Sequence, residues 1–427
     1  MTSPVLECAS APIVATVEVP GSKSVANRAL ICAALADGRS ELTGLPDGDD
    51  TVAMVDGLRR LGTAVELDGS RAIISGHGAD IEGGAVIDAR LAGTTSRFLT
   101  AVAALSPRAT RIDGGEALRR RPMGALHAAL GQLGAQVTPL GVPGCLPVEV
   151  ARAGLRGGRI ELAGDTSSQY ITALMLIGPL LESGLTIEIT STLVSRPYVE
   201  MTAAVMSSFG IGGIGLSESI IHIEAGAYRP TVYHVEPDAS SASYPLAAAA
   251  IAGGRVTVAG LGRNSLQGDS AFAGILANMG CVVRVDDHQT MVERGDRLRG
   301  IDIDMADFSD LVPTVAAVAA FADSPTEISG VGFIRNKESD RLSDLADGLR
   351  RIGCGAEVLD DGLRISPASP TSYVGSELLV HHDHRLAMAW SLLALRIAGV
   401  SVDDPSVVSK SWPNWWSIRR EMLGSTR

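Results

Sequence analysis

The stretch Gly57-Leu58-Arg59-Arg60-Leu61-Gly62-Thr63-Ala64-Val65-Glu66-Leu67 joins the end of an amphipathic helix to the start of a strand through a glycine. Glycine ends helices readily because it adopts the left-handed conformation without a steric penalty. A near copy, GLRRIGCGAEV, occupies residues 348–358. The same pattern of a helix, an apolar residue, a glycine and then a strand occurs six times, with its glycine at Gly62, Gly134, Gly210, Gly280, Gly353 and Gly424.

Successive glycines of this pattern lie 70 to 76 residues apart. Repeats of this length exceed those of solenoids and hold about two helices and three or four strands each. We therefore predict an α/β protein of two domains with three repeats each. The sixth copy ends near the C-terminus, so we expect strands at the N-terminus to complete it. With crossings at Pro20-Gly21 and near Val235 to Asp238, the predicted domains are residues 1–20 with 237–427, and residues 21–236.

Composition excludes several classes of protein. The formal net charge of −12 argues against a nucleic-acid or anionic-membrane surface. No apolar run reaches the length of a membrane span. The segment Met1 to Pro4 lacks the basic region and apolar core of a secretory signal. The five cysteines form no CxxC pair, which is typical of reduced thiols, so we expect a cytoplasmic protein.

The stretch Pro20-Gly21-Ser22-Lys23-Ser24 lies where a strand gives way to an apolar helix. We expect Ser24 to cap this helix, with Lys23 at its mouth and Arg28 on the same side. Free backbone N–H groups and two cations there predict a site for a phosphate or carboxylate. An ordinary strand-to-helix turn is the alternative. A nucleotide P-loop is excluded, because that motif has glycine directly before its lysine.

Similar polar or cationic helix starts recur along the chain. They are Gly93 to Arg97, the arginines Arg119-Arg120-Arg121, Asp165 to Tyr170 with Ser167, Ser168 and Gln169, Ser195-Arg196, and Asp238 to Tyr244. Each is weak by itself, and we expect at least one of the three adjacent arginines to be merely exposed. An acidic chain that gathers cations at such positions is expected to bind a small anion.

Carboxylates join the cations in the second half of the chain. Asp310 precedes an apolar helix, and Glu338 lies between Lys337 and Arg341, which we place on one helix face at i and i+4. A carboxylate among cations stays ionised, yet it exchanges a proton when a substrate adds negative charge. A surface salt bridge between Glu338 and Arg341 is the alternative.

The run His381-His382-Asp383-His384-Arg385 resembles a metal site in composition alone. We predict no metal there, because adjacent residues of a strand point to opposite faces and Arg385 repels a cation. Lys410, in Lys410-Ser411-Trp412-Pro413, adds a cation near the end of the chain.

Taken in order, these motifs resemble the 5-enolpyruvylshikimate-3-phosphate synthase family over nearly the whole chain. The motifs are PGSKSxxNRAL, AGTxxR, RP, SSQ, SRPY, DASSASY, KESDR, DHR and the late Lys-Ser-Trp-Pro. The resemblance implies two similar domains, each of three βαβαββ units, with the active site in the cleft between the domains. It also implies transfer of the enolpyruvyl group of phosphoenolpyruvate to the 5-hydroxyl of shikimate 3-phosphate, without a metal or an organic cofactor.

The resemblance assigns roles by motif. Lys23, Asp310 and Glu338 are expected to be catalytic, with Asp310 as base and Glu338 moving the proton at the methylene carbon of phosphoenolpyruvate. The expected shikimate 3-phosphate contacts are Lys23, Ser24, Arg28, Ser167, Ser168, Gln169, Ser195, Arg196, Asp310 and Lys337. The expected phosphoenolpyruvate contacts are Lys23, Gly93, Arg121, Gln169, Arg341, Arg385 and Lys410. The discontinuous domain would then hold the carboxylates and most phosphoenolpyruvate cations, and residues 21–236 most of the shikimate 3-phosphate site.

Two positions depart from the family pattern. Arg90-Leu91-Ala92-Gly93-Thr94 replaces the common Gly-Asn-Ala-Gly-Thr, so Leu91 lacks the amide, and Phe333 replaces a common Asn. They leave open a paralogue that acts on another cyclic polyol acid; a non-catalytic anion-binding homologue is a further alternative. The related transferase for UDP-N-acetylglucosamine needs a loop cysteine, and Gly115-Glu116-Ala117 stands in that region.

We expect a monomer, and sensitivity to glyphosate because Gly93 leaves room for it.

Overall fold

The structure is a computed structural model that describes residues 5–165 and 167–424. Thr166, within one of the polar helix starts, and the segment Met1 to Pro4 lie outside the described residues. The chain divides into two compact units. We call residues 21–235 the continuous unit, and residues 1–20 with 236–427 the discontinuous unit. Among the described residues, no helix is both long and apolar enough to cross a membrane.

The continuous unit contains three four-stranded mixed sheets, in the orders β13-β2-β4-β3, β5-β6-β8-β7 and β11-β12-β10-β9. Its strands are β2 (Asp37–Thr43), β3 (Ala64–Asp68), β4 (Arg71–His77), β5 (Val86–Asp88), β6 (Thr110–Asp113), β7 (Ala135–Pro139), β8 (Val148–Arg152), β9 (Gly158–Leu162), β10 (Leu185–Ile189), β11 (Ile214–Leu216), β12 (Ile220–Ile223) and β13 (Val232–His234). Its helices are α1 (Lys23–Ala34), α2 (Asp49–Arg60), α3 (Gly93–Ala103), α4 (Glu116–Arg119), α5 (Gly124–Gln132), α6 (Ser168–Ile177), the 3-10 helix η1 (Gly178–Leu180) and α7 (Arg196–Ser208).

The discontinuous unit contains the sheets β1-β14-β16-β15, β17-β18-β20-β19 and the two-stranded β21-β22. Its strands are β1 (Ile13–Val17), β14 (Gly254–Ala259), β15 (Val282–Val285), β16 (Gln289–Glu293), β17 (Asp302–Asp304), β18 (Thr326–Ser329), β19 (Gly355–Leu359), β20 (Gly362–Ser366), β21 (Glu377–Leu378) and β22 (Ser401–Val402). Its helices are α8 (Ala239–Ala252), η2 (Gly268–Ala271), α9 (Phe272–Asn278), η3 (Ser309–Leu311), α10 (Val312–Ala319), η4 (Gly332–Asn336), α11 (Arg341–Arg351), η5 (Pro370–Ser372), α12 (His384–Leu393), η6 (Pro405–Lys410) and α13 (Trp415–Met422).

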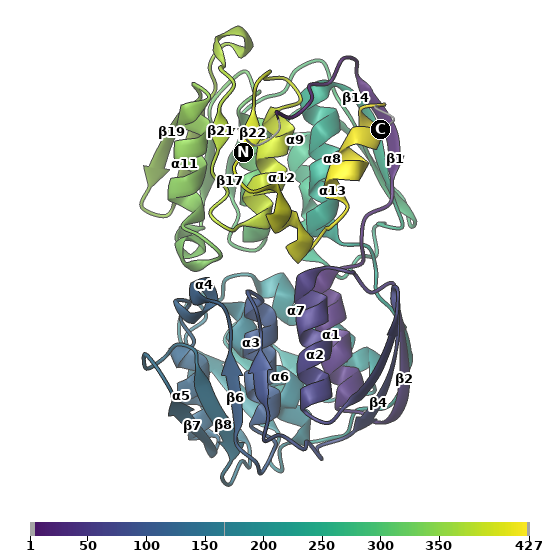
Figure 1. The fold of residues 1–427 in the computed structure, drawn as a ribbon, viewed down its shortest axis with the longest axis vertical. Coiled ribbons are helices and arrows are strands. Elements are labelled where there is room, and N and C mark those ends of the chain that lie inside the picture. Colours follow the sequence, from purple (N-terminus) through teal and green to yellow (C-terminus); the bar gives the residue numbers. More distant parts are fainter. Residues whose placement is uncertain (1–4, 166, 425–427) are drawn as a thin grey trace. The chain divides into compact units, whose positions relative to one another are not determined.

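Three inner helices form the centre of each unit. In the continuous unit α1, α3 and α6 contact one another, and in the discontinuous unit α8, α10 and α12 do so, with sheets on their flanks (Figure 1). These helices are buried along nearly their whole length, as their apolar sequences require. The second helix of several repeats is more amphipathic than the first, and α11 is the clearest case. The first helix of every repeat is therefore an inner helix whose N-terminus follows a sheet strand.

The six repeat glycines confirm the periodicity found in the sequence. Each directly follows the C-cap residue of the second helix of its repeat, and all six adopt positive φ between 73° and 102°. A side chain at such a position is strained, so glycine is required there by the helix end itself. The apolar residue before each glycine packs toward the core; Phe209, Met279 and Ile352 have no exposed surface.

The N-terminal segment contacts the sixth repeat, as expected, but β1 itself pairs elsewhere. Before β1, the Leu6 N–H donates to the Val400 carbonyl at 2.9 Å, and the Ala9 N–H donates to the Leu395 carbonyl at 3.0 Å. β1 pairs in parallel with β14, with Ile13 opposite Gly254 and Val17 opposite Val258. β13 pairs in parallel with β2 in the same way. β1, which precedes the first crossing between the units, therefore pairs with β14, which follows the second crossing. β13, which precedes the second crossing, pairs with β2, which follows the first. The helix-glycine pattern located the repeats correctly but says nothing of which edge strand completes which sheet.

Candidate active site

Several of the expected site residues lie at the N-termini of inner helices in both units. In the continuous unit, Lys23 begins α1, Gly93 begins α3 and Ser168 begins α6. In the discontinuous unit, Asp310 lies in η3, two residues before the start of α10, and Arg385 lies in the first turn of α12. Helix N-termini present unpaired N–H groups and a partial positive charge. Each unit therefore concentrates its polar chemistry at one end of an apolar helix core.

The first helix begins two residues earlier than the sequence suggested. Ser22, not Ser24, is the N-cap of α1, and its hydroxyl accepts from the Val25 N–H at 3.4 Å. Ser24 is inside the first turn because Pro20-Gly21 ends the preceding segment sooner than expected. Lys23 Nζ donates to Asp50 Oδ2 at 2.9 Å, and Asp50 is buried at the start of α2. The cation predicted at the helix mouth is thus fixed by a carboxylate from the neighbouring helix.

Arg28 is buried among neutral oxygens. Its guanidinium donates to Thr202 Oγ1 at 2.8 Å, Thr172 Oγ1 at 3.3 Å, the Tyr198 carbonyl at 3.2 Å and the Ser24 carbonyl at 2.7 Å. Burial lowers the pKa of Arg28 to about 10, which still leaves it charged at neutral pH. A buried cation held by neutral oxygens keeps most of its positive field, which favours an anion nearby.

The start of α3 is packed against two arginines. A side-chain carbon added at Gly93 would lie 2.6 Å from Arg121 Nη1 and 2.9 Å from Arg97 Nη1. Arg97 Nη1 donates to Gln169 Oε1 at 2.5 Å, and the Arg97 guanidinium lies 5.3 Å from the centre of the Tyr170 ring. These contacts bring Gly93, Arg121 and Gln169, all predicted at the phosphoenolpyruvate site, to one place.

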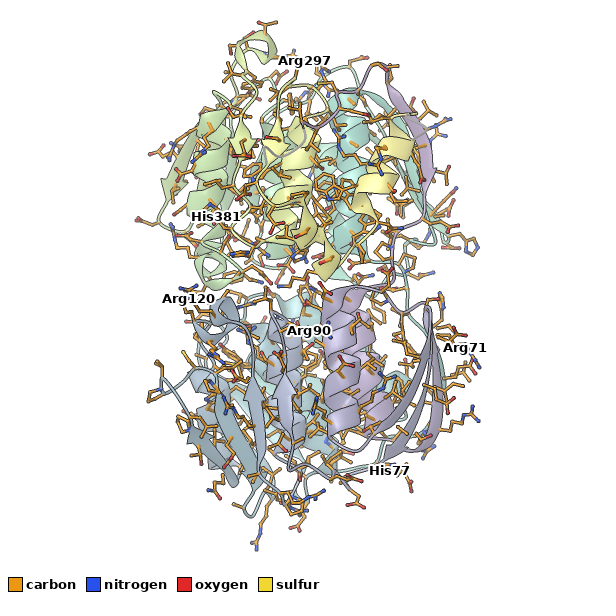
Figure 2. All side chains as sticks on the ribbon, in the orientation of Figure 1. Arg71, His77, Arg90, Arg120, Arg297 and His381 are labelled. Atoms are coloured by element: carbon orange, nitrogen blue, oxygen red, sulfur yellow. The ribbon has the colours of Figure 1, made fainter. Side chains whose placement is uncertain are left out.

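The three adjacent arginines have different surroundings. Arg119 pairs with Asp113 at 2.8 Å, and Arg120 pairs with Glu116 at 3.3 Å at the surface beside α4 (Figure 2). Arg121 is only 8% exposed and is the member that faces Gly93. The expectation that at least one of the three would be merely exposed is confirmed by Arg120.

The serines assigned to the 3-phosphate lie at two helix starts. Ser167 caps α6 and accepts from the Gln169 N–H at 3.3 Å, and Ser168 is the first helical residue. Ser195 caps α7 in a left-handed conformation with φ of 56°, which non-glycine residues rarely adopt. Arg196 donates to Glu200 Oε1 at 3.0 Å and to the Ser217 carbonyl at 3.1 Å. This cation therefore contacts both its own helix and the segment between β11 and β12.

Asp310 is the centre of a cluster of charged side chains in the discontinuous unit. Its carboxylate accepts from Arg385 at 2.8 Å, Arg341 at 3.0 Å and Lys337 at 3.3 Å. Burial raises the pKa of Asp310, but these three cations outweigh it and hold the pKa well below the ordinary value. Asp310 is consequently ionised at neutral pH.

Glu338 lies between two cations. It accepts from Arg341 Nη2 at 2.8 Å and from Lys410 Nζ at 3.0 Å. The sequence placed Lys337 and Arg341 on one helix, and this was wrong: Lys337 follows η4, and α11 begins only at Arg341, after the Asp340 cap. The two cations still meet, because both contact Asp310. The Glu338–Arg341 pair anticipated as an alternative does form, but it is a buried part of the cluster.

The His381-to-Arg385 segment is a turn into a helix, not the strand expected from the sequence. His381 and His382 are exposed with positive φ, and Asp383 caps α12 by accepting from the Arg385 N–H at 2.9 Å. Asp383 also accepts from Arg341 Nε at 2.7 Å. Across the described parts of the chain, no group of three or more His, Cys, Asp and Glu side chains is arranged to hold a metal ion.

One expected anion site is closed. The DASSASY motif begins α8, whose first N–H groups bind the protein itself: Gln267 Oε1 accepts from Ala239, and Asp238 Oδ1 accepts from Ser240 and Ser241. An anion at this helix start would meet the Asp238 carboxylate. The motif therefore supports the neighbouring cluster and does not offer the same kind of site as α1.

Sequence reasoning missed three carboxylates that organise the clusters: Asp50, Asp269 and Asp383. Asp50 contacts Lys23, and Asp383 contacts Arg341 as well as the nearby Arg385. Asp269 contacts Ser240, whose hydroxyl lies beside Arg385. A compositional signal was present, however, because the 427-residue sequence contains three lysines, Lys23, Lys337 and Lys410. All three form ion pairs in these clusters. Elsewhere the positive charge of the chain is carried by arginine.

The two departures from the family pattern have distinct surroundings. Leu91 is 38% exposed at the start of the α3 segment, and Arg90 before it has φ of 52° and pairs with Asp56 at 2.9 Å. The Phe333 ring lies 5.7 Å from Lys337 Nζ, a cation–π distance. Phe333 therefore supports Lys337 by its aromatic face instead of offering a hydrogen bond.

Comparison with known proteins gives one consistent result. The family model for EPSP synthase (3-phosphoshikimate 1-carboxyvinyltransferase) matches residues 8–418. The chain is 40% identical over 416 residues to 3-phosphoshikimate 1-carboxyvinyltransferase of Nostoc punctiforme, covering 96% of this chain and 97% of the relative. It is 41% identical over 408 residues to the enzyme of that name from Methanoculleus marisnigri, covering 95% and 96%. A solved EPSP synthase structure from Acinetobacter baumannii superposes with a TM-score of 0.82 at 26% identity, covering 99% of this chain and 98% of that one. The chain therefore belongs to the EPSP synthase family and has its two-domain enolpyruvyl transferase fold.

Proposed function

We propose that this chain transfers the enolpyruvyl group of phosphoenolpyruvate to the 5-hydroxyl of shikimate 3-phosphate and releases inorganic phosphate. The reaction belongs to the shikimate pathway of aromatic amino acid synthesis, and the enzyme is a transferase. The observation that carries the proposal is the Asp310–Glu338 cluster, in which two carboxylates share four cations. Such a cluster suits a reaction that binds anions and moves protons.

Binding is assigned mainly to the cations and hydroxyls of the helix starts. In the continuous unit, Ser167, Ser168, Ser195 and Arg196 hold the 3-phosphate, Ser24 and Arg28 the shikimate ring, and Gln169 lies against that ring. Gly93 and Arg121 contact phosphoenolpyruvate, and Lys23 contacts both substrates. In the discontinuous unit, Arg341, Arg385 and Lys410 bind phosphoenolpyruvate, and Lys337 binds shikimate 3-phosphate. Fixed cations in a dry site stabilise the several negative charges of the two substrates.

The chemistry is assigned to two carboxyl groups. Glu338 adds a proton to the methylene carbon of phosphoenolpyruvate, which makes the neighbouring carbon electrophilic. The 5-hydroxyl attacks that carbon while Asp310 takes its proton, and a tetrahedral adduct forms. The methyl group then returns a proton to Glu338, and the electrons of that C–H bond form the new carbon–carbon double bond. The carbon–oxygen bond to phosphate breaks, phosphate leaves with the electron pair of that bond and takes the proton held by Asp310, and the enolpyruvyl ether remains. The substrate's negative charge loosens the hold of Lys337, Arg341 and Arg385 on Asp310, which makes it basic enough for this step.

The direct test is phosphate release from phosphoenolpyruvate by the purified protein in the presence of a chelator. Three acceptors are compared: shikimate 3-phosphate, unphosphorylated shikimate and UDP-N-acetylglucosamine. We expect release with shikimate 3-phosphate alone. Release with none of them, while both substrates still bind, would favour a paralogue with another acceptor and direct attention to Leu91 and Phe333. Release that depends on a divalent metal would contradict the mechanism given above.

Two further properties complete the proposal. The chain acts in the cytoplasm, where its five free cysteines stay reduced. It acts as a monomer, since its exposed large apolar residues are scattered over several elements, for example Val14, Val86 and Val232. Light scattering across a range of protein concentrations tests the monomer, and a concentration-dependent mass would contradict it.

A further inference from the structure

A fourth carboxyl group lies beside the Asp310 cluster and has no part in the mechanism above. Asp269, in η2 before α9, is 3% exposed. The hydroxyl of Ser240 donates a short hydrogen bond to Asp269 Oδ2. Ser240 is the second residue of α8, and its backbone is fixed by the Asp238 cap at 2.8 Å. Asp269 is therefore held rigidly at the base of an inner helix.

Ser240 links Asp269 to the reaction cluster. Its hydroxyl oxygen lies 3.5 Å from Arg385 Nη2, and the same nitrogen donates to Asp310 Oδ2 at 2.8 Å. The chain of contacts thus runs from Asp269 through Ser240 and Arg385 to Asp310. A change in the charge of Asp269 acts on the guanidinium that we assign to phosphoenolpyruvate.

The cluster has no excess of positive charge before any substrate arrives. Asp269, Asp310, Glu338 and Asp383 supply four carboxyl groups, Asp238 beside Asp269 adds a fifth, and Lys337, Arg341, Arg385 and Lys410 supply four cations. An anionic substrate adds negative charge to this buried set. Uncompensated charge is costly in a buried site. Uptake of a proton by one carboxyl group offsets the charge that the substrate adds.

Asp269 is the carboxyl group best placed to take that proton. Burial, followed by the negative charge of Asp310, raises its pKa to about 6, whereas Arg385 and the Ser240 hydroxyl lower it less. Asp238 also faces it and raises the pKa further. A bound anion adds a further negative charge and shifts the pKa in the same direction. Asp310 differs, since its three cations keep it ionised.

We propose that Asp269 is a positioning residue for the reaction: through Ser240 it holds Arg385 in place, and it takes up one proton from solvent when phosphoenolpyruvate enters the cluster. This inference rests on the proposed function, because it assigns phosphoenolpyruvate to Arg385. The proton ends on a carboxyl oxygen of Asp269, and no bond of the substrate changes in this step. Protonated Asp269 still offers Ser240 an acceptor oxygen, so Arg385 keeps its place.

The test measures proton uptake directly. Phosphoenolpyruvate is titrated into the wild type and into Asp269→Asn at pH 7 by calorimetry, in two buffers that differ in ionisation enthalpy. Asn keeps an acceptor oxygen for Ser240 but cannot take a proton. The matched control is Asp287→Asn, which removes an exposed carboxylate paired with Arg263 at 2.8 Å in the same unit. Titration of the ligand itself is common to all three proteins and cancels in the comparison.

We expect the wild type and Asp287→Asn to take up at least half a proton more than Asp269→Asn, on the order of the change for one group with a pKa near neutrality. The phosphoenolpyruvate affinity of the wild type should also fall more steeply with rising pH. Equal uptake in all three proteins, or a KM raised by the same factor at every pH in Asp269→Asn, would overturn the inference. A wild type that fails to bind phosphoenolpyruvate would instead refute the proposed function, and thermal melting checks that each variant is folded.

Discussion

The two units share an architecture of three inner helices, yet they differ in how they hold their buried arginines. In the continuous unit, Arg28 and Arg97 are held by hydroxyl, carbonyl and amide oxygens, although Lys23 there pairs with Asp50. In the discontinuous unit, the site cations Lys337, Arg341 and Lys410 are bound to carboxylates. Cations held by neutral groups attract an anion directly, whereas cations bound to carboxylates must exchange one anion for another. The comparison supports the proposed division, in which the first unit mainly binds and the second mainly moves protons.

The largest expected effect concerns the proton-moving side of this comparison. Glu338→Ala should lower kcat by about 10³-fold, because it removes a group that transfers a proton in the reaction. Shikimate 3-phosphate should still bind, since the contacts that we assign to its phosphate lie in the continuous unit. The control is Glu327→Ala, which removes an exposed glutamate paired with Arg364 at 2.6 Å in the same unit. Turnover that survives in Glu338→Ala would show that another group carries the proton.

The second prediction concerns the binding side and uses two neighbouring arginines. Arg121→Ala should raise the KM for phosphoenolpyruvate about 10²-fold, because a buried charge-assisted contact is lost. Arg120→Ala should change it by less than about twofold, since its pair with Glu116 is at the surface. Steady-state kinetics with both substrates varied separates KM from kcat. If Arg121→Ala lowered kcat and left KM unchanged, the division of roles between the units would fail.

The third prediction concerns space at the start of α3. Gly93→Ala should raise the KM for phosphoenolpyruvate and the inhibition constant of glyphosate by about tenfold, because the added carbon pushes Arg121 from its position. Gly131→Ala is the matched control, since no atom lies within 4 Å of a carbon added there. Inhibition constants that stay unchanged in Gly93→Ala would refute the steric argument.

The fourth prediction concerns the pH dependence of stability, and it carries the smallest expected effect on activity. His127 in α5 is 8% exposed, and burial lowers its pKa to about 4. Between pH 6.5 and 4 the unfolded chain takes up a proton that folded His127 refuses, so stability falls as the pH drops through this window. The loss is about 3 kcal/mol at most. His127→Leu should remove it in urea unfolding at pH 4.5 and 7.5, with His288→Leu as an exposed control; equal slopes in both variants would contradict the assignment.

Asp269 gives the opposite dependence in the other unit. Its folded pKa of about 6 lies above the ordinary value, so the folded state binds more protons between pH 4 and 6 and stability falls as the pH rises there. His127 thus lowers the stability of the continuous unit as the pH falls from 6.5 to 4. Asp269 lowers the stability of the discontinuous unit as the pH rises from 4 to 6. The same unfolding series on Asp269→Asn separates these two slopes.

Local features of this protein were predictable from sequence, and long-range pairings were not. The six helix-ending glycines were found because each is required by its own turn, and the cationic helix starts because composition marks them. The cap of α1, the turn at His381 and the irregular segment from Lys337 to Asp340 depend on where neighbouring elements begin. Asp50 and Asp269 were missed because their partners lie 27 and 29 residues away, and no pattern links such positions.

The edge strands show the same limit at the level of the fold. β1 and β13 are short, and each could pair with any exposed strand of suitable direction. Their actual partners, β14 and β2, lie more than 190 residues away in the sequence. Only the closed hydrophobic core of each unit decides between such partners, and this is a property of the whole chain.

The distribution of lysine has a practical consequence. Lys23, Lys337 and Lys410 are the lysines of this sequence, and their side chains are 14%, 21% and 8% exposed. Acylating reagents attack amines and spare guanidinium groups. Every lysine that they could reach belongs either to the Lys23–Asp50 pair or to the cluster around Asp310 and Glu338. Coupling the protein to a resin or a dye through its amines therefore puts the clusters at risk, while cysteine coupling at exposed Cys8 does not. Conversely, protection of these amines by a ligand would report directly that the ligand occupies a cluster.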